Sequence, residues 1–310
     1  MLAISTDWNC HRYTDGEALL SELRTLGLTE IEVGPGSNIA LFPGFRRVLK
    51  SGRAKVISLA NFTPAPIDWQ RFGIANCELT SPSRVLREQA LEWTRITIDH
   101  AAGLEASFVV LRLGRVGMNG FTEALFRQVR AGGLHSRKFV STKLDGVRER
   151  ARLSEAWLSR ALRSLENLVP YAKACGIRLA ITGAGGYEDG PTENEVVQLM
   201  SEFSGAGYLG YWHDFSATQR KANLGLLDHA QWLTEVRPHV LGSYVSDLRW
   251  PDETGCVPLS GIIPFEQLVP LLPHDTPAVW KIGPSQRGAE LRQMLPVWEE
   301  RFVRGVPAAG

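Results

Sequence analysis

The sequence is poor in several features that would assign it to a particular class of protein. It has 4 cysteines in 310 residues, and no two of them form a CxxC pair. This scarcity argues against a disulfide framework or a zinc knot, and it favours reduced thiols in a cytoplasm. A net charge of +1 gives no global field that would draw the protein to nucleic acid or to an anionic membrane.

The chain also lacks signals for export and membrane insertion. Its first residues, MLAISTDWNCH, contain neither a basic segment nor a long apolar one, so we expect no signal peptide. No apolar run approaches the roughly 20 residues that a membrane-spanning helix needs. We therefore expect a cytoplasmic protein without a membrane partner, and we expect its short tail, residues 305–310, to be frayed.

The sequence does contain a regular alternation of short apolar runs and helical segments. Helical spacing and capping residues predict the helices, for example from the Asp15 cap to Leu26. Strand–helix pairs at a repeat of roughly 30 residues predict an α/β fold, a single-domain (β/α)8 TIM barrel over residues 1–304. A doubly wound open sheet is the alternative, and the absence of a GxGxxG turn argues against it. The predicted strands are 2–7, 29–34, 55–61, 107–113, 177–182, 207–213, 240–246 and 277–282.

One connection is longer than the others and strongly basic. Residues 114–153 separate the fourth strand from a helix predicted over residues 154–174, and they contain nine arginine and lysine residues. An insertion at the carboxyl end of a barrel strand is a candidate lid over the site. A solvated basic helix pair on the rim is the alternative, and the sequence does not decide between the two.

Polar residues end most of the predicted strands, where barrel enzymes place their catalytic groups. In the run YLGYWHDFSAT, residues 208–218, a buried strand brings Asp214 to the mouth of the barrel. His213 precedes it by one place and points toward the helices, so we interpret it as structural. The other strand ends carry Asp7, Glu32, Asn61, Arg112, Thr182, Asp247 and Lys281.

Several stretches, taken in order, resemble one known superfamily. They are ALLSELRTLGLTEIEVG, LTSPSRVLREQALEWTRITIDHAAGLEASFVVLRLG, RSLENLVPYAKACGIRLAIT, YLGYWHD, VLGSYVSDL and GIIPFEQL. From about residue 2 to residue 302 the chain resembles the xylose isomerase-like TIM barrels, which include sugar phosphate isomerases and epimerases and metal-dependent apurinic endonucleases. The resemblance implies a carbohydrate or polyol as the small-molecule ligand.

The resemblance also implies a divalent metal held by strand-end carboxylates and imidazoles, and this sequence departs from that pattern. Thr182 and Lys281 stand where the family has glutamates, and only Asp214 keeps a ligand position. Threonine and lysine cannot replace these donors, so we predict that the family's Mn²⁺, Zn²⁺ or Mg²⁺ is lost and that no cofactor binds. Ala60, Ala217, Tyr244 and Ser246 stand where the family has histidines.

Lys281 is the most informative departure. An ammonium beside Asp214 would supply part of the metal's positive charge, so Lys281 is a candidate for stabilising an oxyanion or transferring a proton. A salt bridge that only neutralises a buried charge is the alternative. Glu32 is a second candidate base and Tyr244 a candidate acid, although a strand tyrosine is more often part of the core.

Candidate substrate-binding residues lie near the same strand ends. Arg112 and Arg115 flank the end of the fourth strand, where an arginine suits a ligand carboxylate or phosphate. A rim arginine paired with an acid is the alternative. The remaining candidates are Trp8, His11, Thr182 and Asp247, and an aromatic floor for a sugar ring would be formed by Trp8, Phe62, Trp69 and Trp250.

Two functions remain open from the sequence. The first is an isomerase, epimerase or lyase that acts on a sugar or polyol without a metal, with Asp214 or Glu32 removing a proton next to a carbonyl. The second is a catalytically inactive pseudoenzyme that binds a sugar-like ligand or partners an active homologue. A DNA-repair endonuclease fits poorly because the metal cluster and a basic DNA-binding face are missing, so we expect no nucleic-acid partner. Assembly as a homo-oligomer, or as a hetero-oligomer with an active relative, also stays open.

Overall fold

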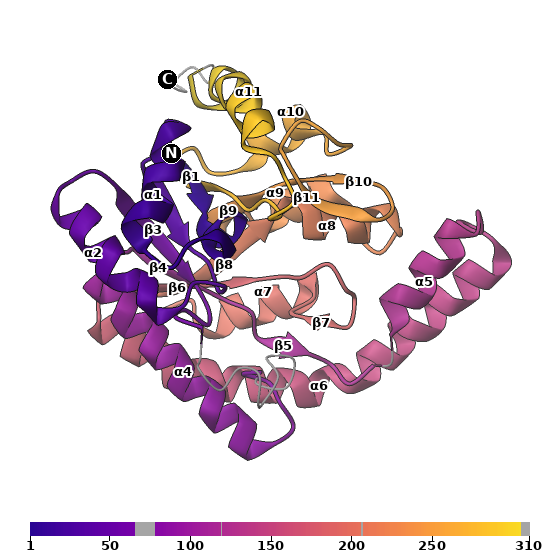
Figure 1. Ribbon diagram of the computed structural model, residues 1–310. Coiled ribbons are helices and arrows are strands. Elements are labelled where there is room, and N and C mark those ends of the chain that lie inside the picture. The colour runs from indigo at the N-terminus through magenta and orange to yellow at the C-terminus, as the bar shows by residue number, and fades with distance from the viewer. Residues whose placement is uncertain (66–77, 119, 206, 305–310) are drawn as a thin grey trace.

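The computed structural model describes residues 1–65, 78–118, 120–205 and 207–304. Eight parallel strands close into a barrel in the order β1-β12-β9-β8-β6-β4-β3-β2, and helices surround it (Figure 1). This confirms the predicted (β/α)8 barrel and excludes the open sheet. The strands are β1 (Leu2–Ser5), β2 (Glu30–Val33), β3 (Lys55–Ala60), β4 (Phe108–Leu111), β6 (Arg178–Thr182), β8 (Leu209–Asp214), β9 (Val240–Val245) and β12 (Ala278–Trp280).

Two of the helices that cover the barrel begin at capping residues that the sequence makes recognisable, Asp15 and Thr192. Asp15 accepts a hydrogen bond from the backbone N–H of Ala18 at 3.2 Å, and Thr192 forms a capping box with Glu195. The helices are α1 (Gly16–Thr25), α2 (Phe42–Lys50), α4 (Arg84–Gly103), α5 (Phe121–Arg130), α6 (Arg137–Ala174), α7 (Glu193–Glu202), α8 (Phe215–Asn223), α9 (His229–Val236), α10 (Phe265–Leu268) and α11 (Gly288–Glu299).

The interior of the barrel is a packed core. The indole of Trp212 lies 5.6 Å from the ring of Phe108 and 5.7 Å from the ring of Tyr244, measured between centroids. Gly242 makes room for this indole, since a Cβ there would lie 2.1 Å from a Trp212 ring carbon. This packed layer closes the barrel interior, so a site can form only at the carboxyl ends of the strands, on the far side of Tyr244 from the Trp212 layer.

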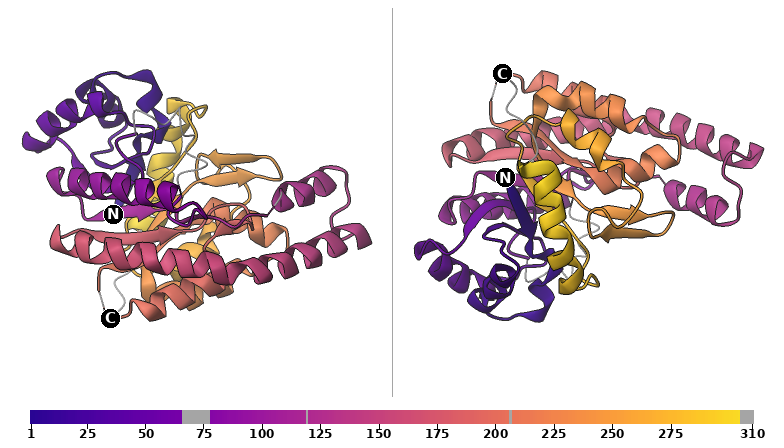
Figure 2. Two further views of the ribbon diagram at one scale, coloured as in Figure 1. Left: turned by 90° about the horizontal axis from the view of Figure 1, so that it is seen from below. Right: turned by 90° about the horizontal axis from the view of Figure 1, so that it is seen from above.

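The basic insertion is largely helical, and the prediction that its helix begins at residue 154 is wrong. Helix α6 begins at Arg137 and runs for 38 residues, about 57 Å at 1.5 Å per residue. Its first half pairs with α5, and the hairpin of the two helices projects beyond the barrel (Figures 1 and 2). The two helices approach closely at Gly146, where a Cβ would lie 1.9 Å from a ring carbon of Phe121.

Other elements at the barrel mouth were missed from the sequence. Helix α8 follows β8 directly, and the sequence analysis predicted no helix at this position. Two short antiparallel pairs also stand on the rim: β5 (Gly114–Arg115) with β7 (Asp189–Gly190), and β10 (Asp247–Arg249) with β11 (Glu253–Cys256).

None of the helices in the described part of the chain has the length and apolarity needed to cross a membrane. The predicted frayed tail, residues 305–310, and the predicted floor residue Trp69 lie outside the described residues.

Candidate active site

A two-part cavity opens at the carboxyl ends of the strands, and we call it the mouth cleft. Its large lobe has a volume of about 540 Å³ and lies over Tyr244 and the ends of β1, β3, β4 and β6. Its second lobe has a volume of about 340 Å³ and lies against the first turns of α8, so we call it the α8 lobe. Arg112 and Lys281 line both lobes. The large lobe also contains Asp7, Arg115 and Thr182, and the α8 lobe contains Asp214, Ser216 and Arg220.

Lys281 lies at the junction of the two lobes, above a buried chain of polar groups. Its Nζ lies 4.0 Å from the centroid of the Tyr244 ring. The Tyr244 hydroxyl donates a hydrogen bond to Glu32 Oε2 at 2.9 Å, and the Ser58 hydroxyl donates to the same oxygen at 2.9 Å. Glu32 is fully buried and is not part of the cleft lining, so it acts on the cleft through Tyr244.

Burial of this chain of polar groups shifts the pKa values of its members. Burial raises the pKa of Glu32 to about 7. Burial and the neighbouring Glu32 raise the pKa of Tyr244 well above its ordinary value, so the phenol stays protonated and serves as a donor. Burial lowers the pKa of Lys281, and Arg112 lowers it further, while Asp214 opposes this shift.

Asp214 reaches the cleft but does not form the expected contact ion pair with Lys281. Its Oδ1 accepts a hydrogen bond from the backbone N–H of Ala217 at 2.9 Å and thereby caps α8. Within the described ranges, no carboxylate forms an ion pair with Lys281. The two groups therefore face one cavity, in which a ligand can contact both.

Three predicted substrate-binding residues do not line the cleft. Asp247 is fully buried, and its carboxylate accepts hydrogen bonds from the backbone N–H groups of residues 248, 261 and 263 at 2.8, 2.9 and 3.1 Å. Trp8 belongs to the outer core, where its indole N–H donates to the Gln286 carbonyl at 2.9 Å. His11 is exposed on a short 3-10 helix. The sequence did not indicate this role for Asp247, because two of the three amides that it binds belong to residues 261 and 263, which are distant along the chain.

The predicted aromatic floor is only partly present. Phe62 lines the large lobe. Trp250 instead packs against Phe126 of α5, with centroids 5.4 Å apart, and so fixes the rim. Arg115 lines the large lobe but pairs with Asp189 at 3.0 Å, which is the rim pairing that the sequence left open.

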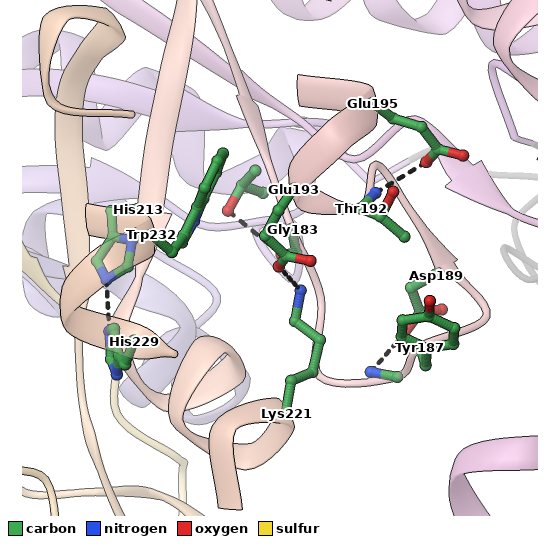
Figure 3. Close-up of polar contacts among 12 residues, drawn as sticks. Gly183, Tyr187, Asp189, Thr192, Glu193, Glu195, His213, Lys221, His229 and Trp232 are labelled. Carbon is green, nitrogen blue, oxygen red and sulfur yellow. Dashed lines mark hydrogen bonds and ion pairs between the residues drawn. The ribbon is translucent and has the colours of Figure 1, made fainter. Parts of the chain in front are cut away.

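His213 is structural, as predicted. It is fully buried on the helix-facing side of β8, and its Nε2 lies 3.0 Å from Nε2 of His229 (Figure 3). Burial lowers the pKa of His213 well below its usual range and that of His229 to about 3, so both rings are neutral. This pair fills the space between β8 and α9 and takes no part in the cleft.

The wall of the α8 lobe is fixed by polar contacts in the loop after β6 (Figure 3). The Asp189 carboxylate accepts a hydrogen bond from the Gly186 N–H at 2.9 Å. Lys221 of α8 pairs with Glu193 at the start of α7. Arg220, a residue that the sequence interpretation did not single out, projects into this lobe beside the loop. Its position could have been inferred from Asp214 as a helix cap, because Ser216 and Arg220 then share one helix face.

The residues at the mouth do not fit the divalent metal of the related barrels. In the described part of the chain, no three His, Cys, Asp or Glu side chains are grouped so that they could hold one ion. The cleft presents Lys281 and Arg112 where a cation would need anionic or neutral donors. We therefore derive no step through a metal.

The same barrel occurs in solved structures of sugar epimerases. A D-tagatose 3-epimerase-like protein aligns with a TM-score of 0.69 at 12% identity, over 99% of each chain. The chain shares the (β/α)8 TIM-barrel fold of these structures. Within this fold, the 3-keto-D-glucoside 4-epimerase of E. coli aligns with a TM-score of 0.66 at 12% identity, over 96% of this chain and 97% of that one. A putative xylose isomerase from Rhodospirillum rubrum aligns with a TM-score of 0.66 at 13% identity, over 99% of each chain.

No family model and no curated protein matches the sequence. At this level of identity, the xylose isomerase-like likeness shows the fold and leaves the chemistry to be argued from the mouth cleft.

Proposed function

We propose that this protein is a metal-independent sugar isomerase or epimerase. The observation that carries the proposal is the mouth cleft itself: Lys281 and Arg112 line both lobes, together with Asp7 in the large lobe and with Asp214 in the α8 lobe. A base and a cation on opposite sides of a bound ligand are the minimum needed to remove a proton next to a carbonyl. The names of the structural neighbours, which are sugar epimerases, support a carbohydrate as the ligand.

The proposed reaction uses the cleft residues in separate roles. The carboxylate of Asp214 accepts a proton from the carbon next to the carbonyl, and the electron pair of that C–H bond moves onto the carbonyl oxygen as an enolate. Lys281 and Arg112 stabilise the negative charge on this oxygen by hydrogen bonding. Protonation of the same carbon from the opposite face, by Asp7 or a water in the large lobe, gives an epimer. Protonation of the former carbonyl carbon, with the hydroxyl proton on the deprotonated carbon passing to the former carbonyl oxygen, gives an isomer. Tyr244, held by Glu32, positions the ammonium of Lys281.

A sugar-binding protein without turnover is the second candidate. The observation that favours it is the engagement of Asp214 as a helix cap, which occupies one of the two oxygens of the proposed base. In that case the cleft would bind a sugar, alone or in complex with an active homologue, and no C–H bond would break.

Hydrogen exchange separates the two candidates. We would incubate the chelator-treated protein in D₂O with D-fructose, D-fructose 6-phosphate and D-fructuronate, and follow deuterium incorporation next to the carbonyl by NMR. The proposal expects incorporation into at least one compound, reduced by about 100-fold or more in Lys281→Met, since the loss of one oxyanion donor typically costs that much. Lys138→Met, which removes an exposed lysine of α6, should leave the rate unchanged.

The same experiment can contradict the proposal in two ways. Binding without incorporation would favour the sugar-binding protein. Incorporation that appears only after Mn²⁺ or Mg²⁺ is added would contradict the metal-independent mechanism.

A further inference from the structure

Three cations line the α8 lobe without a carboxylate partner. They are Arg112 from the end of β4, Arg220 from α8 and Lys281 from the end of β12. Among the described residues, none of the three takes part in an ion pair. The two acids of the lobe are engaged elsewhere: Asp214 caps α8, and Asp189 binds Arg115 and the Gly186 N–H.

Elsewhere this protein neutralises the cations that it buries. Arg150 is 2% exposed and forms two parallel hydrogen bonds of 2.8 Å with the Glu195 carboxylate. Lys221 is 5% exposed and pairs with Glu193. Such pairing is expected, because an uncompensated charge out of water is costly. The α8 lobe differs, because the half-buried Arg220 and Lys281 and the exposed Arg112 line one cavity and form no ion pair with any described carboxylate.

Arg220 is held in place for this role. Its guanidinium carbon lies 4.4 Å from the ring centroid of Phe126, and a Cβ on Gly185 would lie 3.1 Å from its Nη1. Its Nε is buried and has no hydrogen-bond partner in the described part of the chain, and the same holds for the hydroxyl of Ser216, a residue that is 5% exposed. Buried donors left without acceptors cost free energy, and an anionic ligand would supply the acceptors.

We propose that the α8 lobe binds an anionic group, a carboxylate or a phosphate, on a sugar whose carbonyl lies at the junction of the two lobes, beside Lys281 and in the cavity that Asp214 also lines. The planar guanidinium groups of Arg112 and Arg220 suit the oxygens of either group. Because Arg112 and Lys281 line both lobes, one ligand can span them. This inference rests on the proposed function for the identity of the ligand as a sugar, and it adds the charge of that sugar.

A matched set of ligands tests the inference. We would measure by calorimetry the Kd of D-fructose, D-fructuronate, D-fructose 6-phosphate and inorganic phosphate. We expect at least one of the two anionic sugars to bind at least 10-fold more tightly than D-fructose. A preference for D-fructuronate identifies the group as a carboxylate, and a preference for the sugar phosphate identifies it as a phosphate. Binding of the preferred sugar should weaken as salt rises, because ions screen the attraction.

Variants assign the effect to the lobe. Arg220→Gln should remove the preference by raising the Kd of the anionic sugar about 10-fold, while the Kd of D-fructose stays the same. Arg127→Gln, on the exposed face of α5, is the matched control and should change neither value. If Arg220→Gln does not fold, as judged by its thermal unfolding, Ser216→Ala makes the same test at the second unpartnered donor of the lobe.

The outcomes distinguish this inference from the proposed function. Equal affinity for neutral and anionic sugars, no binding of either anionic sugar, or Arg220→Gln indistinguishable from Arg127→Gln would overturn the inference. Deuterium exchange on D-fructose with no anionic preference would leave the proposed function standing alone. Tight binding of an anionic sugar that depends on Arg220, without deuterium exchange on any sugar, would support the inference and contradict the proposed function.

Discussion

Glu32 lies inside the barrel and forms no ion pair with any cation of the described residues, and its environment predicts how stability depends on pH. Burial raises its pKa to about 7, from the 4.5 of a free glutamate. Glu32 therefore binds a proton more tightly in the folded protein than in the unfolded chain. Its contribution to stability is fully present below about pH 4.5 and is lost as pH rises to about 7. At about 1.4 kcal/mol per pH unit, the loss is roughly 3 kcal/mol.

Glu32→Gln removes this titration while keeping the shape of the side chain. We expect the free energy of unfolding in urea to fall between pH 4.5 and pH 7.5 in the wild type by roughly 3 kcal/mol more than in the variant. Glu92→Gln, at an exposed position of α4, should follow the wild type. Parallel pH profiles for wild type and Glu32→Gln would show that Glu32 is ionised throughout.

At the residue scale, the sequence predicted side chains whose place follows from strand register alone. Asp214 ends β8, Tyr244 precedes the last residue of β9 and Lys281 directly follows β12, so their positions at one mouth follow once the strands are known. The partners of Asp247 and the environment of Trp8 could not be predicted in this way, because the loops that contact them follow no period.

At the element scale, the carboxylate of Asp247 organises the segment that runs from β10 to residue 263. It holds three backbone N–H groups of this segment. Asp247→Ala leaves these buried donors without an acceptor, so we expect a loss of at least about 3 kcal/mol in the free energy of unfolding, measured with urea. Asp275→Ala, at an exposed position, should cost less than about 0.5 kcal/mol. A small change in Asp247→Ala would mean that water replaces the carboxylate.

The elements that the sequence missed share one physical cause. Helix α8 and the first half of α6 are rich in charged and polar residues, so they show little apolar periodicity. What holds them is contact with other parts of the rim, such as Lys221 of α8 with Glu193 and Arg150 of α6 with Glu195. Tertiary contacts of this kind cannot be read from a local pattern, whereas the barrel strands could be read because they are apolar on both faces.

At the scale of the whole molecule, the donor set predicts that folding does not depend on a divalent metal. We expect the thermal midpoint to change by less than about 1 °C with a chelator or with added Mn²⁺, Zn²⁺ or Mg²⁺. A metal raises the midpoint only if it binds the folded state, by an amount that grows with its concentration relative to its Kd. Elemental analysis of the purified protein checks the same point. Stoichiometric metal together with a fall in the midpoint on chelation would contradict the prediction.

The length of α6 has a mechanical consequence. One end of this helix is anchored to the barrel, where Trp157 packs against Gly190 and Leu165 is fully buried, and the other end carries the hairpin beyond the barrel. The Arg150–Glu195 pair clamps it between the two. A helix that is held at one end and again partway along its length cannot rotate as a rigid body without bending. We therefore expect the basic hairpin to be a rigid projection beside an open cleft, so that ligand entry and release do not depend on its movement.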